Sequence, residues 1–477
     1  MQMVDNNGPP QPPTREGHRG DSQTSAASND ESPDSTTRDV SEFNAGIAKE
    51  GHLQYGTSES RYVGSTHWSA ILENIQELKS ALGGGSGNSP EVVGGGGGGD
   101  DAYHPTATEL DESDDVEPAE MDGLFGSTSH LSLASIISQA LPPREVVDRR
   151  LSTYFQSSYM VIPFIHARQF QRQYEQFWRT PYETSPLWIS MLFSICCMSA
   201  TLSEAVGSEP STPEDQPSPR ATFLNAACQC LRLGGFLRPK RWVVEALGLY
   251  AHSKFMSTLD PARDVGVIFA IVVRLAYRSG YHRDPSQFAH ISVFDGEMRR
   301  RTWAMCRQFD LMVSFQLGLP NLIPHNSWDT QNPRNLHDAD FDEDCKVLPP
   351  SRPETEASQI LYFIVKSRLM TTFGKVCAHA LTFTDCDPAT CARFIMELDR
   401  EVRATYATVP EVLHIKPMSQ SYADPSYLTM VRTNCEFLYQ KSLLVLHRKY
   451  MTQDVHYHAG SIKACTDAAL AITRHML

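Results

Sequence analysis

Residues 297–320, EMRRRTWAMCRQFDLMVSFQLGLP, place three consecutive arginines beside a tryptophan. Guanidinium groups can contact the phosphates of a nucleic acid, and they can equally pair with carboxylates inside a folded protein. The apolar residues recur at every third or fourth position, which gives a helix one firmly apolar face. Successive helical residues are turned by about 100°, so the three arginines cannot line one groove-facing stripe. The pattern favours a structural helix over a helix that reads DNA.

Acidic residues in the same segment support the structural interpretation. Glu297 precedes Arg301 by four residues, which is a favourable spacing for an ion pair along a helix. Asp310 lies in the otherwise apolar second half, where a buried carboxylate needs a partner. We therefore expect the arginines to pair with acidic neighbours inside a helical domain.

A short triplet just before this segment matches a catalytic motif only in part. His282-Arg283-Asp284 is similar to the catalytic loop of protein kinases. Ala289 stands at the position of the required asparagine, and no glycine-rich phosphate loop precedes the triplet. We therefore expect no kinase activity.

An acidic run after the segment has the spacing of a calcium loop. Asp338, Asp340 and Asp342 alternate as the first ligands of such a loop do. A calcium loop continues with glycine at its sixth position and glutamate at its twelfth, whereas this chain has Glu343 and Pro349 there. An acidic loop that pairs with arginines is the expected alternative.

The cysteine and histidine pattern gives little support to a metal site. All 11 cysteines follow position 195, mostly in apolar context, where free cysteine behaves as a small buried hydrophobe. Cys386 and Cys391 lie near His379 but lack a second cysteine pair, and His456 and His458 stand apart. No Gly-x-Ser-x-Gly or His-Glu-x-x-His motif occurs. We predict no catalytic residue, no metal site and no cofactor within this chain.

The arginine-rich segment lies within a long series of helical patterns. Apolar residues recur at helical spacing in SLASIISQAL (132–141), which stops at Pro142-Pro143. Further helical patterns cover about 144–160, 164–178, 186–204, 219–233, 240–257, 264–279, 295–317, 357–382, 388–406, 426–451 and 460–477. Strand-like alternation is scarce. We predict that residues 132–477 form a large all-α domain.

One apolar segment is long enough to raise the question of a membrane. LWISMLFSICCMSATLS (187–203) has 17 residues, whereas a transmembrane helix needs about 20. It contains several serines and threonines and lacks flanking lysines and arginines. We predict a buried helix and no membrane contact.

The N-terminal part has a different composition from the rest. Residues 1–135 hold 23 acidic and 6 basic residues, while 136–477 hold the remaining 33 acidic and 36 basic residues. The net charge of −14 therefore belongs to the N-terminal part. We expect residues 1–131 to be a disordered acidic and glycine-rich region with one short amphipathic helix near 65–82. Its segment 109–126 interleaves acidic and apolar residues, which suits either a coactivator contact or a solubilising spacer.

Several stretches together resemble the regulatory middle region of fungal zinc-cluster (Zn2Cys6) transcription factors. They are RLAYRSGYHRDPSQF (274–288), FDGEMRRRTWAMCRQFDLMVSFQLGLP (294–320), WDTQNPRNLHDADFDED (328–344) and LPPSRPETEAS (348–358). The signature positions are Gly280, His282, Arg283, Asp284, Glu297, Arg299, Arg300, Arg301, Trp303, Asp310, Ser314, Gly318 and Pro320. The resemblance implies an all-α regulatory domain with a signature core at about 141–345. Its arginines, Trp303 and Asp310 would hold that core together without a catalytic role.

The chain departs from this family in one respect. The family reads DNA through a six-cysteine, two-zinc cluster near the N-terminus, whereas the first cysteine here is Cys196. Zinc needs thiolate or imidazole ligands at suitable spacing. Either the chain is a regulator without a zinc cluster, or its sequence is incomplete at both ends. Zinc is expected only if a cluster is encoded upstream.

The resemblance implies a nuclear regulator of RNA polymerase II transcription, which contacts DNA indirectly or through a missing zinc cluster. The alternative is an interaction partner that modulates intact zinc-cluster regulators without binding DNA itself. A homodimer, or a heterodimer with other zinc-cluster regulators, is expected. Arg238-Pro239-Lys240-Arg241 either aids nuclear import or begins a helix.

Overall fold

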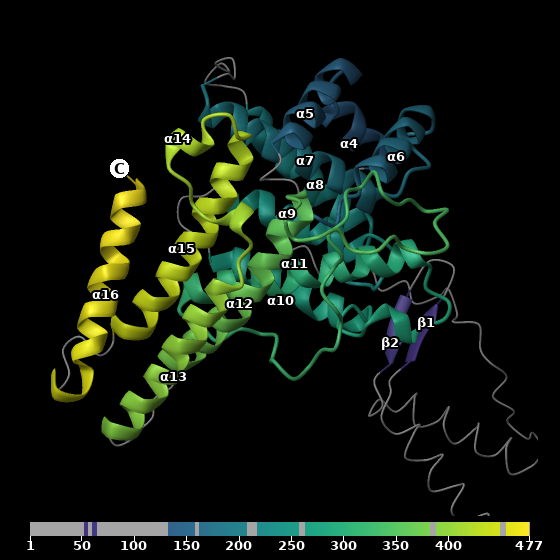
Figure 1. Ribbon diagram of the computed structural model, residues 1–477. Helices are drawn as coiled ribbons and strands as arrows, with labels where there is room; N and C mark the ends of the chain where they lie inside the picture. Colours follow the sequence, from purple (N-terminus) through teal and green to yellow (C-terminus); the bar gives the residue numbers. More distant parts are fainter. Residues whose placement is uncertain are drawn as a thin grey trace, which may run out of the picture. The chain divides into compact units, whose positions relative to one another are not determined.

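The computed structural model describes residues 52–55, 60–63, 132–157, 162–207, 217–256, 263–381, 388–448 and 455–476. All of them lie in the compact unit Gly51–Leu477. Their regular structure is almost entirely helical, so the predicted all-α fold is confirmed (Figure 1). The predicted amphipathic helix near 65–82 and the acidic segment 109–126 lie outside the described residues.

Local sequence explains where the first helices begin. These helices are α4 (Leu133–Ala140), α5 (Arg144–Gln156), α6 (Ala167–Arg179), α7 (Pro186–Ala205), α8 (Pro219–Leu233) and α9 (Val243–Met256). Ser132 and Ser218 cap α4 and α8, because each hydroxyl accepts a hydrogen bond from a backbone N–H three residues on, at 3.2 Å. Proline begins α7 and α8, at a position where a helix needs no N–H donor.

Helix α7 lies in the interior of the fold. Every residue from Leu187 to Ala200 is buried, and the helix packs against α5, α8 and α9. It is the one described helix that is long and apolar enough to cross a membrane, and 78% of the relevant window is buried inside the protein. This is the burial expected of a core helix.

The arginines lie on the longest described helix. α10 (Arg263–Arg278) leads through the short 3-10 helix η2 (Pro285–Gln287) into α11 (Val293–Leu317). The hydroxyl of Ser292 accepts a hydrogen bond from the N–H of Asp295 at 3.0 Å and so begins α11. The helix ends at Gly318, whose φ of 68° is left-handed, and the N–H of Leu319 donates to the carbonyl of Ser314 at 2.8 Å.

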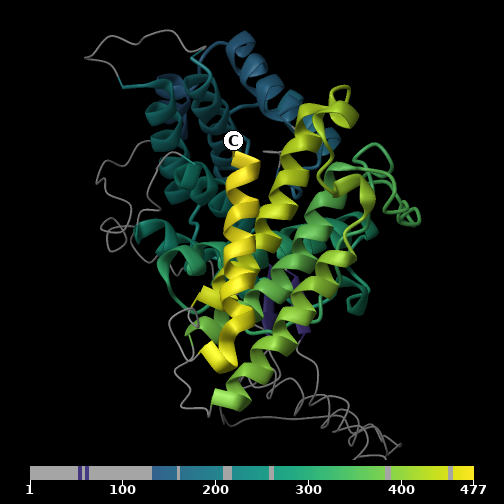
Figure 2. The ribbon, with the colours of Figure 1, turned by 60° about the vertical axis from the view of Figure 1, so that its left-hand side comes forward.

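A second group of helices follows a long irregular segment, residues 318–358. The group consists of α12 (Gln359–Leu381), α13 (Pro388–Ala407), α14 (Met418–Ser421), α15 (Ser426–Arg448) and α16 (Val455–Met476), with the 3-10 turn η3 (Glu411–Leu413). α15 packs against α12, α13 and α16, so the four long helices lie alongside one another (Figure 2).

Helix α11 belongs to two hydrophobic cores. Trp303, Cys306 and Phe309 lie in the larger core, which α4 to α10 also form. Leu311 lies in a second core with residues of α12, α13, α15 and α16. The helix that carries the arginines therefore packs in the cores of both groups of helices.

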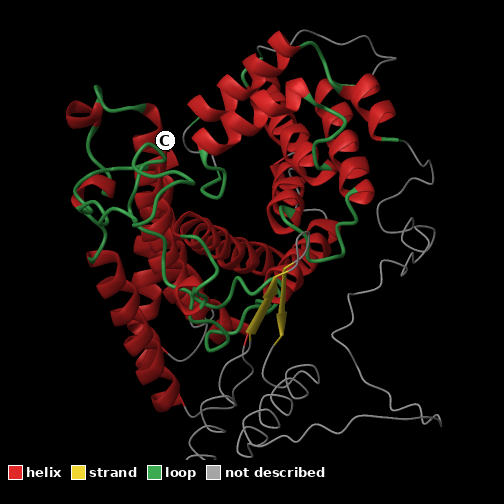
Figure 3. Cartoon of the chain, turned by 90° about the vertical axis from the view of Figure 1, so that its right-hand side faces the viewer, coloured by secondary structure: helices red, strands yellow, loops and turns green. Residues whose placement is uncertain are grey.

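A two-stranded antiparallel hairpin is the one sheet among the described residues (Figure 3). β1 (His52–Tyr55) pairs with β2 (Ser60–Val63), with His52 opposite Val63. No regular structure was expected at these positions from the sequence. Each strand has only four residues, which is too short for an alternation of period two to stand out.

Candidate functional site

The three consecutive arginines of α11 point into the protein. Arg301 is fully buried, Arg299 is 8% exposed, and the side chain of Arg300 is 12% exposed. Each guanidinium group donates its hydrogen bonds to a different part of the fold. In this arrangement none of the three is placed to contact the phosphates of DNA from the surface.

Arg300 forms a two-point ion pair with Asp284. Its Nε donates to Oδ2 at 3.0 Å and its Nη2 donates to Oδ1 at 2.7 Å, which is the geometry that the guanidinium fork favours. Asp284 also accepts hydrogen bonds from the backbone N–H groups of Ser286 and Gln331, at 3.1 and 2.9 Å. Burial raises the pKa of Asp284, but the hydrogen bonds, above all those from Arg300, hold it well below its ordinary 3.8.

A second carboxylate, Asp329, ties the same turn to the irregular segment. It accepts hydrogen bonds from the backbone N–H of Asp284 at 2.8 Å, from Arg283 Nη1 at 2.9 Å and from Gln287 Nε2 at 3.1 Å. The N–H of Asp329 donates to the carbonyl of His282 at 3.0 Å. The kinase-like triplet is therefore part of a closed turn, in which Arg283 and the carboxylate of Asp284 are hydrogen-bonded within the fold.

Arg301 and Glu297 are buried together. Arg301 Nη1 donates to Asp338 Oδ1 at 2.7 Å, and Arg301 Nε lies 3.5 Å from Glu297 Oε1. Glu297 also accepts a hydrogen bond from the backbone N–H of Arg334 at 3.0 Å. Burial raises the pKa of Glu297 above its ordinary 4.5 in spite of the neighbouring Arg301. These contacts join α11 to the irregular segment.

Arg299 is held by a backbone carbonyl and an aromatic ring. Its Nη2 donates to the carbonyl of Ser279, and its guanidinium carbon lies 4.3 Å from the centroid of the Tyr281 ring. The hydroxyl of Tyr281 donates to Glu245 Oε1 at 2.6 Å. Burial raises the pKa of both Glu245 and Tyr281. This cluster links α9, the turn after α10, and α11.

Trp303 packs where that turn crosses α11. Its ring meets the ring of Tyr277 nearly edge-on, with centroids 5.3 Å apart, and the centroid of the His282 ring lies 6.2 Å away. Burial and then the charge of Arg283 lower the pKa of His282 to about 4, so this imidazole is neutral at neutral pH. Gly280 has a left-handed φ of 72°, and this conformation lets the chain turn sharply after α10.

Asp310 holds the chain where it leaves α11. Its two carboxylate oxygens accept hydrogen bonds from the backbone N–H groups of Leu322 and Ile323, at 3.0 and 2.9 Å. Burial raises the pKa of Asp310 in spite of these hydrogen bonds. The turn through Gly318 and the exposed Pro320 reverses the chain and brings those two N–H groups back to the helix.

The carboxylates of the acidic loop face different partners. Asp338 pairs with Arg301, and Asp340 forms a two-point pair with Arg352, with both contacts at 2.8 Å. Asp342 accepts a hydrogen bond from the backbone N–H two residues on. The loop thus pairs largely with arginines, as expected for the alternative to a calcium site.

The cysteines and histidines that were weighed as weak metal-site candidates show no metal-binding arrangement where they are described. Cys386 lies outside the described residues, as do the side chains of His456 and His458. The ring of His379 lies against that of Phe394, with centroids 5.0 Å apart. Across the described segments, no group of three or more His, Cys, Asp or Glu side chains could hold a metal ion.

A serine, a histidine and an aspartate form a line that was not predicted from the sequence. His447 Nδ1 lies 3.0 Å from Ser461 Oγ, and His447 Nε2 lies 3.0 Å from Asp399 Oδ1. Ser461 is only 4% exposed and lies within α16, so its hydroxyl is not placed to attack a substrate. The three residues join α13, α15 and α16, and their separation in sequence left no local motif to recognise.

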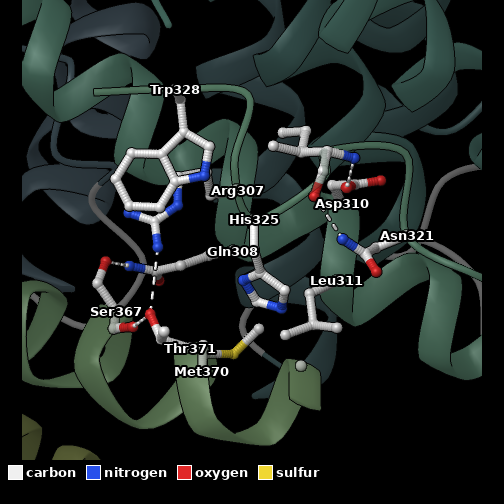
Figure 4. A pocket seen from close by; sticks show the side chains of 12 residues that line it. Arg307, Gln308, Asp310, Leu311, Asn321, His325, Trp328, Ser367, Met370 and Thr371 are labelled. Atoms are coloured by element: carbon white, nitrogen blue, oxygen red, sulfur yellow. Dashed lines mark hydrogen bonds between the residues drawn. The ribbon is translucent and has the colours of Figure 1, made fainter. Parts of the chain in front are cut away.

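A small cavity between α11, α12 and the segment 321–328 was likewise not predicted (Figure 4). Arg307 lines it, four residues after Trp303 on α11. An arginine within an apolar helical pattern, with no acidic residue four positions before it, was the signal available in the sequence.

Comparisons with known proteins identify the fold around this network. Residues 151–387 match the fungal specific transcription factor domain. A Zn(2)-C6 fungal-type transcription factor of Monascus ruber is 35% identical over 431 residues, which are 89% of this chain and 50% of that protein. The chain belongs to the fungal zinc-cluster transcription factor family. Within that family, the arginine network lies in the fungal specific transcription factor domain.

Two further relatives extend the comparison within the zinc-cluster family. The equisetin cluster transcription factor of Fusarium heterosporum is 32% identical over 93% of this chain and 62% of that protein. The fusarisetin A cluster transcription factor of a Fusarium species is 33% identical over 90% of this chain and 55% of that protein. The chain thus spans about half to three-fifths of the length of these relatives. No solved structure matches the chain.

Proposed function

We propose that this protein is a nuclear regulator of RNA polymerase II transcription, with residues 132–477 as its regulatory domain. The observation that carries the proposal is the match of residues 151–387 to the fungal specific transcription factor domain. Relatives named as transcription factors along 89% to 93% of this chain give further support. Two relatives are each named for a cluster that bears the name of a compound, equisetin in one and fusarisetin A in the other. We therefore extend the proposal to control of the genes of such a cluster.

The position of the arginines supports the proposal that this domain has a regulatory role and that DNA contact lies elsewhere. Arg300 pairs with the buried carboxylate of Asp284, and Arg301 pairs with the partly buried carboxylate of Asp338. The first cysteine of the sequence is Cys196, so residues 1–195 contain no six-cysteine cluster. We assign DNA reading to a zinc cluster outside this sequence, and zinc belongs to that cluster.

A second candidate function follows from the same cysteine pattern. The chain would act as a partner that modulates intact zinc-cluster regulators, as a heterodimer, without binding DNA itself. A homodimer of the regulator remains part of the first proposal. Segment 109–126, outside the described residues, is proposed as a coactivator contact because it interleaves acidic and apolar residues.

Gene disruption tests the proposed function. Deleting the gene should change the transcript levels of a set of genes, and restoring the full coding sequence should reverse the change. RNA sequencing of the two strains measures this outcome. Unchanged transcript levels across conditions in which the protein is made would overturn the proposal.

A binding experiment separates the two candidate functions. The natural protein, tagged at its chromosomal locus, is immunoprecipitated with chromatin, and the enriched promoters are then incubated with the purified 477-residue chain. Enrichment by a natural protein of 477 residues, together with no binding by that chain alone, favours the partner function. A co-purifying zinc-cluster protein would identify that partner, and a larger natural protein that carries its own zinc cluster favours the first function.

Deletion within the full chain tests the proposed coactivator contact. Removing 109–126 should lower transcription of the regulated genes without lowering the amount of protein. Removal of 20–37, a segment of equal length that is also outside the described residues, is the matched control. Equal effects of the two deletions would contradict the coactivator role.

A further inference from the structure

Arg307 lines a small cavity between two helices and a loop. The guanidinium carbon of Arg307 lies 3.6 Å from the centroid of the Trp328 ring, and the two groups are stacked in Figure 4. Its Nη2 donates a hydrogen bond to Thr371 Oγ1 at 3.2 Å. Figure 4 shows this stack on one side of the cavity, with Ser367 and Thr371 of α12 below it. Arg307 is therefore held in one orientation by α12 and by the loop.

The charge of Arg307 is not neutralised within the described segments. A guanidinium group has five N–H donors, and the bond to Thr371 is the one hydrogen bond that Arg307 forms there. No carboxylate lies within ion-pair distance of it in these segments, in contrast to Arg300 and Arg301. Burial alone lowers the pKa of Arg307 to about 10, so the group still carries its charge at neutral pH.

Two other titratable groups, His325 and Asp310, line the same cavity. Burial and then the charges of Arg307 and Lys375 lower the pKa of His325, which lines the same cavity. Asp310 also lines it, but its oxygens accept hydrogen bonds from backbone N–H groups on the side opposite Arg307 (Figure 4). Arg307 is partly buried, and a partly buried cation without a counter-ion costs free energy that a bound anion would remove.

A second unsatisfied group lines the cavity beside Arg307. Gln308 is 3% exposed, and its Nε2 donates to the carbonyl of Phe363 at 3.0 Å and to Ser367 Oγ at 2.6 Å. A carbonyl oxygen only accepts hydrogen bonds, so the amide nitrogen must face Phe363, and this fixes the orientation of the amide. The Oε1 atom of Gln308 is buried and has no donor in the described segments. It needs an N–H or O–H group.

The size of the cavity limits what can satisfy both groups. Its volume is about 40 Å³. On the same measure one water needs roughly 10–15 Å³, so the space holds about three waters, and since bonded atoms lie closer together than separate waters, it suits a compact group of about five heavy atoms. A carboxylate with one neighbouring polar group has that size, and its two oxygens match the guanidinium fork.

We propose that this cavity binds a small carboxylate that carries a hydroxyl or amino group next to its carboxyl carbon. The carboxylate pairs with Arg307, and the neighbouring O–H or N–H donates to Gln308 Oε1. Trp328 holds the guanidinium group in place by stacking. The ligand would thereby connect α11 to α12, which belongs to the second group of helices. This inference concerns binding alone and stands whether or not the chain regulates transcription.

Saturation-transfer NMR on the full chain tests the proposal with three probes of similar size. Glycolate has both the carboxylate and the neighbouring hydroxyl, acetate lacks the hydroxyl, and glycolamide lacks the charge. Ligands this small bind weakly, so the dissociation constant expected for glycolate is on the order of millimolar. Glycolate should bind more tightly than acetate, and glycolamide should not bind.

Substitutions connect the binding to the two unsatisfied groups. Arg307→Met should weaken glycolate binding by about 10- to 100-fold, the range expected for a charged hydrogen-bonded contact. Gln308→Met should reduce glycolate binding to the level of acetate and leave acetate binding unchanged. Arg274→Met, at an exposed position on α10, is the matched control and should bind as the natural chain does. Circular dichroism confirms that each variant is folded.

Several results would overturn the proposal. One is the absence of saturable glycolate binding by the natural chain, which would leave water as the occupant of the cavity. Others are equal binding of glycolamide, or tighter binding of inorganic phosphate than of glycolate. If Arg307→Met does not fold, the relative affinities of glycolate, acetate and glycolamide for the natural chain decide whether the proposal holds.

Discussion

Arg300 and Asp284 meet in a two-point ion pair that joins the middle of α11 to the turn after α10, although 16 residues separate them in sequence. Asp284 in turn accepts the backbone N–H of Gln331, 47 residues further on. One carboxylate therefore fixes three segments of the fold relative to one another. We therefore expect an arginine at this position to be needed for structure.

Loss of this pair should destabilise the protein. Arg300→Ala leaves a buried carboxylate without its partner, and we expect the free energy of unfolding to fall by about 3 kcal/mol. Arg300→Lys keeps the charge but not the two-point geometry, so its effect should be smaller. Urea unfolding measures both. Arg144→Ala is the control, because the side chains of Arg144 and Glu175 are 43% and 47% exposed and such pairs contribute under about 1 kcal/mol. Equal losses in Arg300→Ala and Arg144→Ala would contradict the assignment.

Trp303 should contribute by packing. It is 1% exposed and contacts Tyr277, so Trp303→Ala opens a large cavity and should cost about 4 kcal/mol. Trp303→Phe should cost less because it keeps an aromatic ring in place. The midpoint of thermal unfolding by circular dichroism reports the change. Tyr182→Ala, at a position 64% exposed, should leave the midpoint nearly unchanged. An unchanged midpoint in Trp303→Ala would refute a structural role.

The stability contributed by Asp310 should depend on pH in a defined direction. Asp310→Ala leaves the N–H groups of Leu322 and Ile323 without their acceptor, which should cost about 2 kcal/mol. Burial raises the folded-state pKa above the ordinary 3.8, so the folded protein binds a proton before the unfolded chain does. Lowering the pH through the folded-state pKa therefore stabilises the natural protein, and the variant lacks this gain.

Unfolding in urea at neutral pH and at about pH 5 measures this difference. The difference in the free energy of unfolding between the natural protein and Asp310→Ala should be larger at the lower pH. Asp467→Ala, at an exposed position on α16, supplies the control and should show no such increase. A difference that is smaller at the lower pH would mean that the carboxyl group has a lowered pKa, contrary to its burial.

The line of Ser461, His447 and Asp399 should hold helices together without hydrolysing substrates. Hydrolysis of p-nitrophenyl acetate by the natural chain should equal that by Ser461→Ala. His447→Ala should lower the free energy of unfolding by about 2 kcal/mol, because it leaves buried polar partners on α13 and α16 unsatisfied. Faster hydrolysis by the natural chain than by Ser461→Ala would show that the serine is reached by substrate.

Thiol reactivity should follow burial. Burial raises the pKa of the thiols of Cys196, Cys230 and Cys435 to about 12, and a protonated buried thiol is a poor nucleophile. Among the described cysteines, Cys345 and Cys391 are the partly exposed ones, so rapid labelling by a disulfide reagent should concentrate there. Mass spectrometry of the labelled, folded protein identifies the sites. Rapid labelling of Cys196 would show that the α7 core opens readily.

The helices were largely predictable because each carries its own periodic pattern. The predicted range 219–233 coincides with α8, and 186–204 differs from α7 by one residue, since proline and serine mark their beginnings. The hairpin at 52–63 was not predicted, because two strands of four residues leave little pattern. The interior position of Arg299 and Arg301 agrees with the expectation that the apolar face of α11 serves the core.

The partners of the arginines were only partly predictable. Glu297 lies one helical turn before Arg301, so their approach to 3.5 Å follows from spacing alone. Asp338 is 37 residues away from Arg301, and nothing local marks it as the stronger partner. The buried line through His447 and Asp399 likewise joins residues 48 positions apart.

The sequence by itself determined the helices, the structural character of the arginine segment and the resemblance to zinc-cluster regulators. These features rest on local periodicity and on short motifs, which are present in the chain before it folds. Only the tertiary structure decided which carboxylate each arginine meets, and that Arg307 meets none in the described segments. The physical reason is that ion pairs and cavities form between segments far apart in sequence, so their geometry exists only after α11 has packed between the two groups of helices.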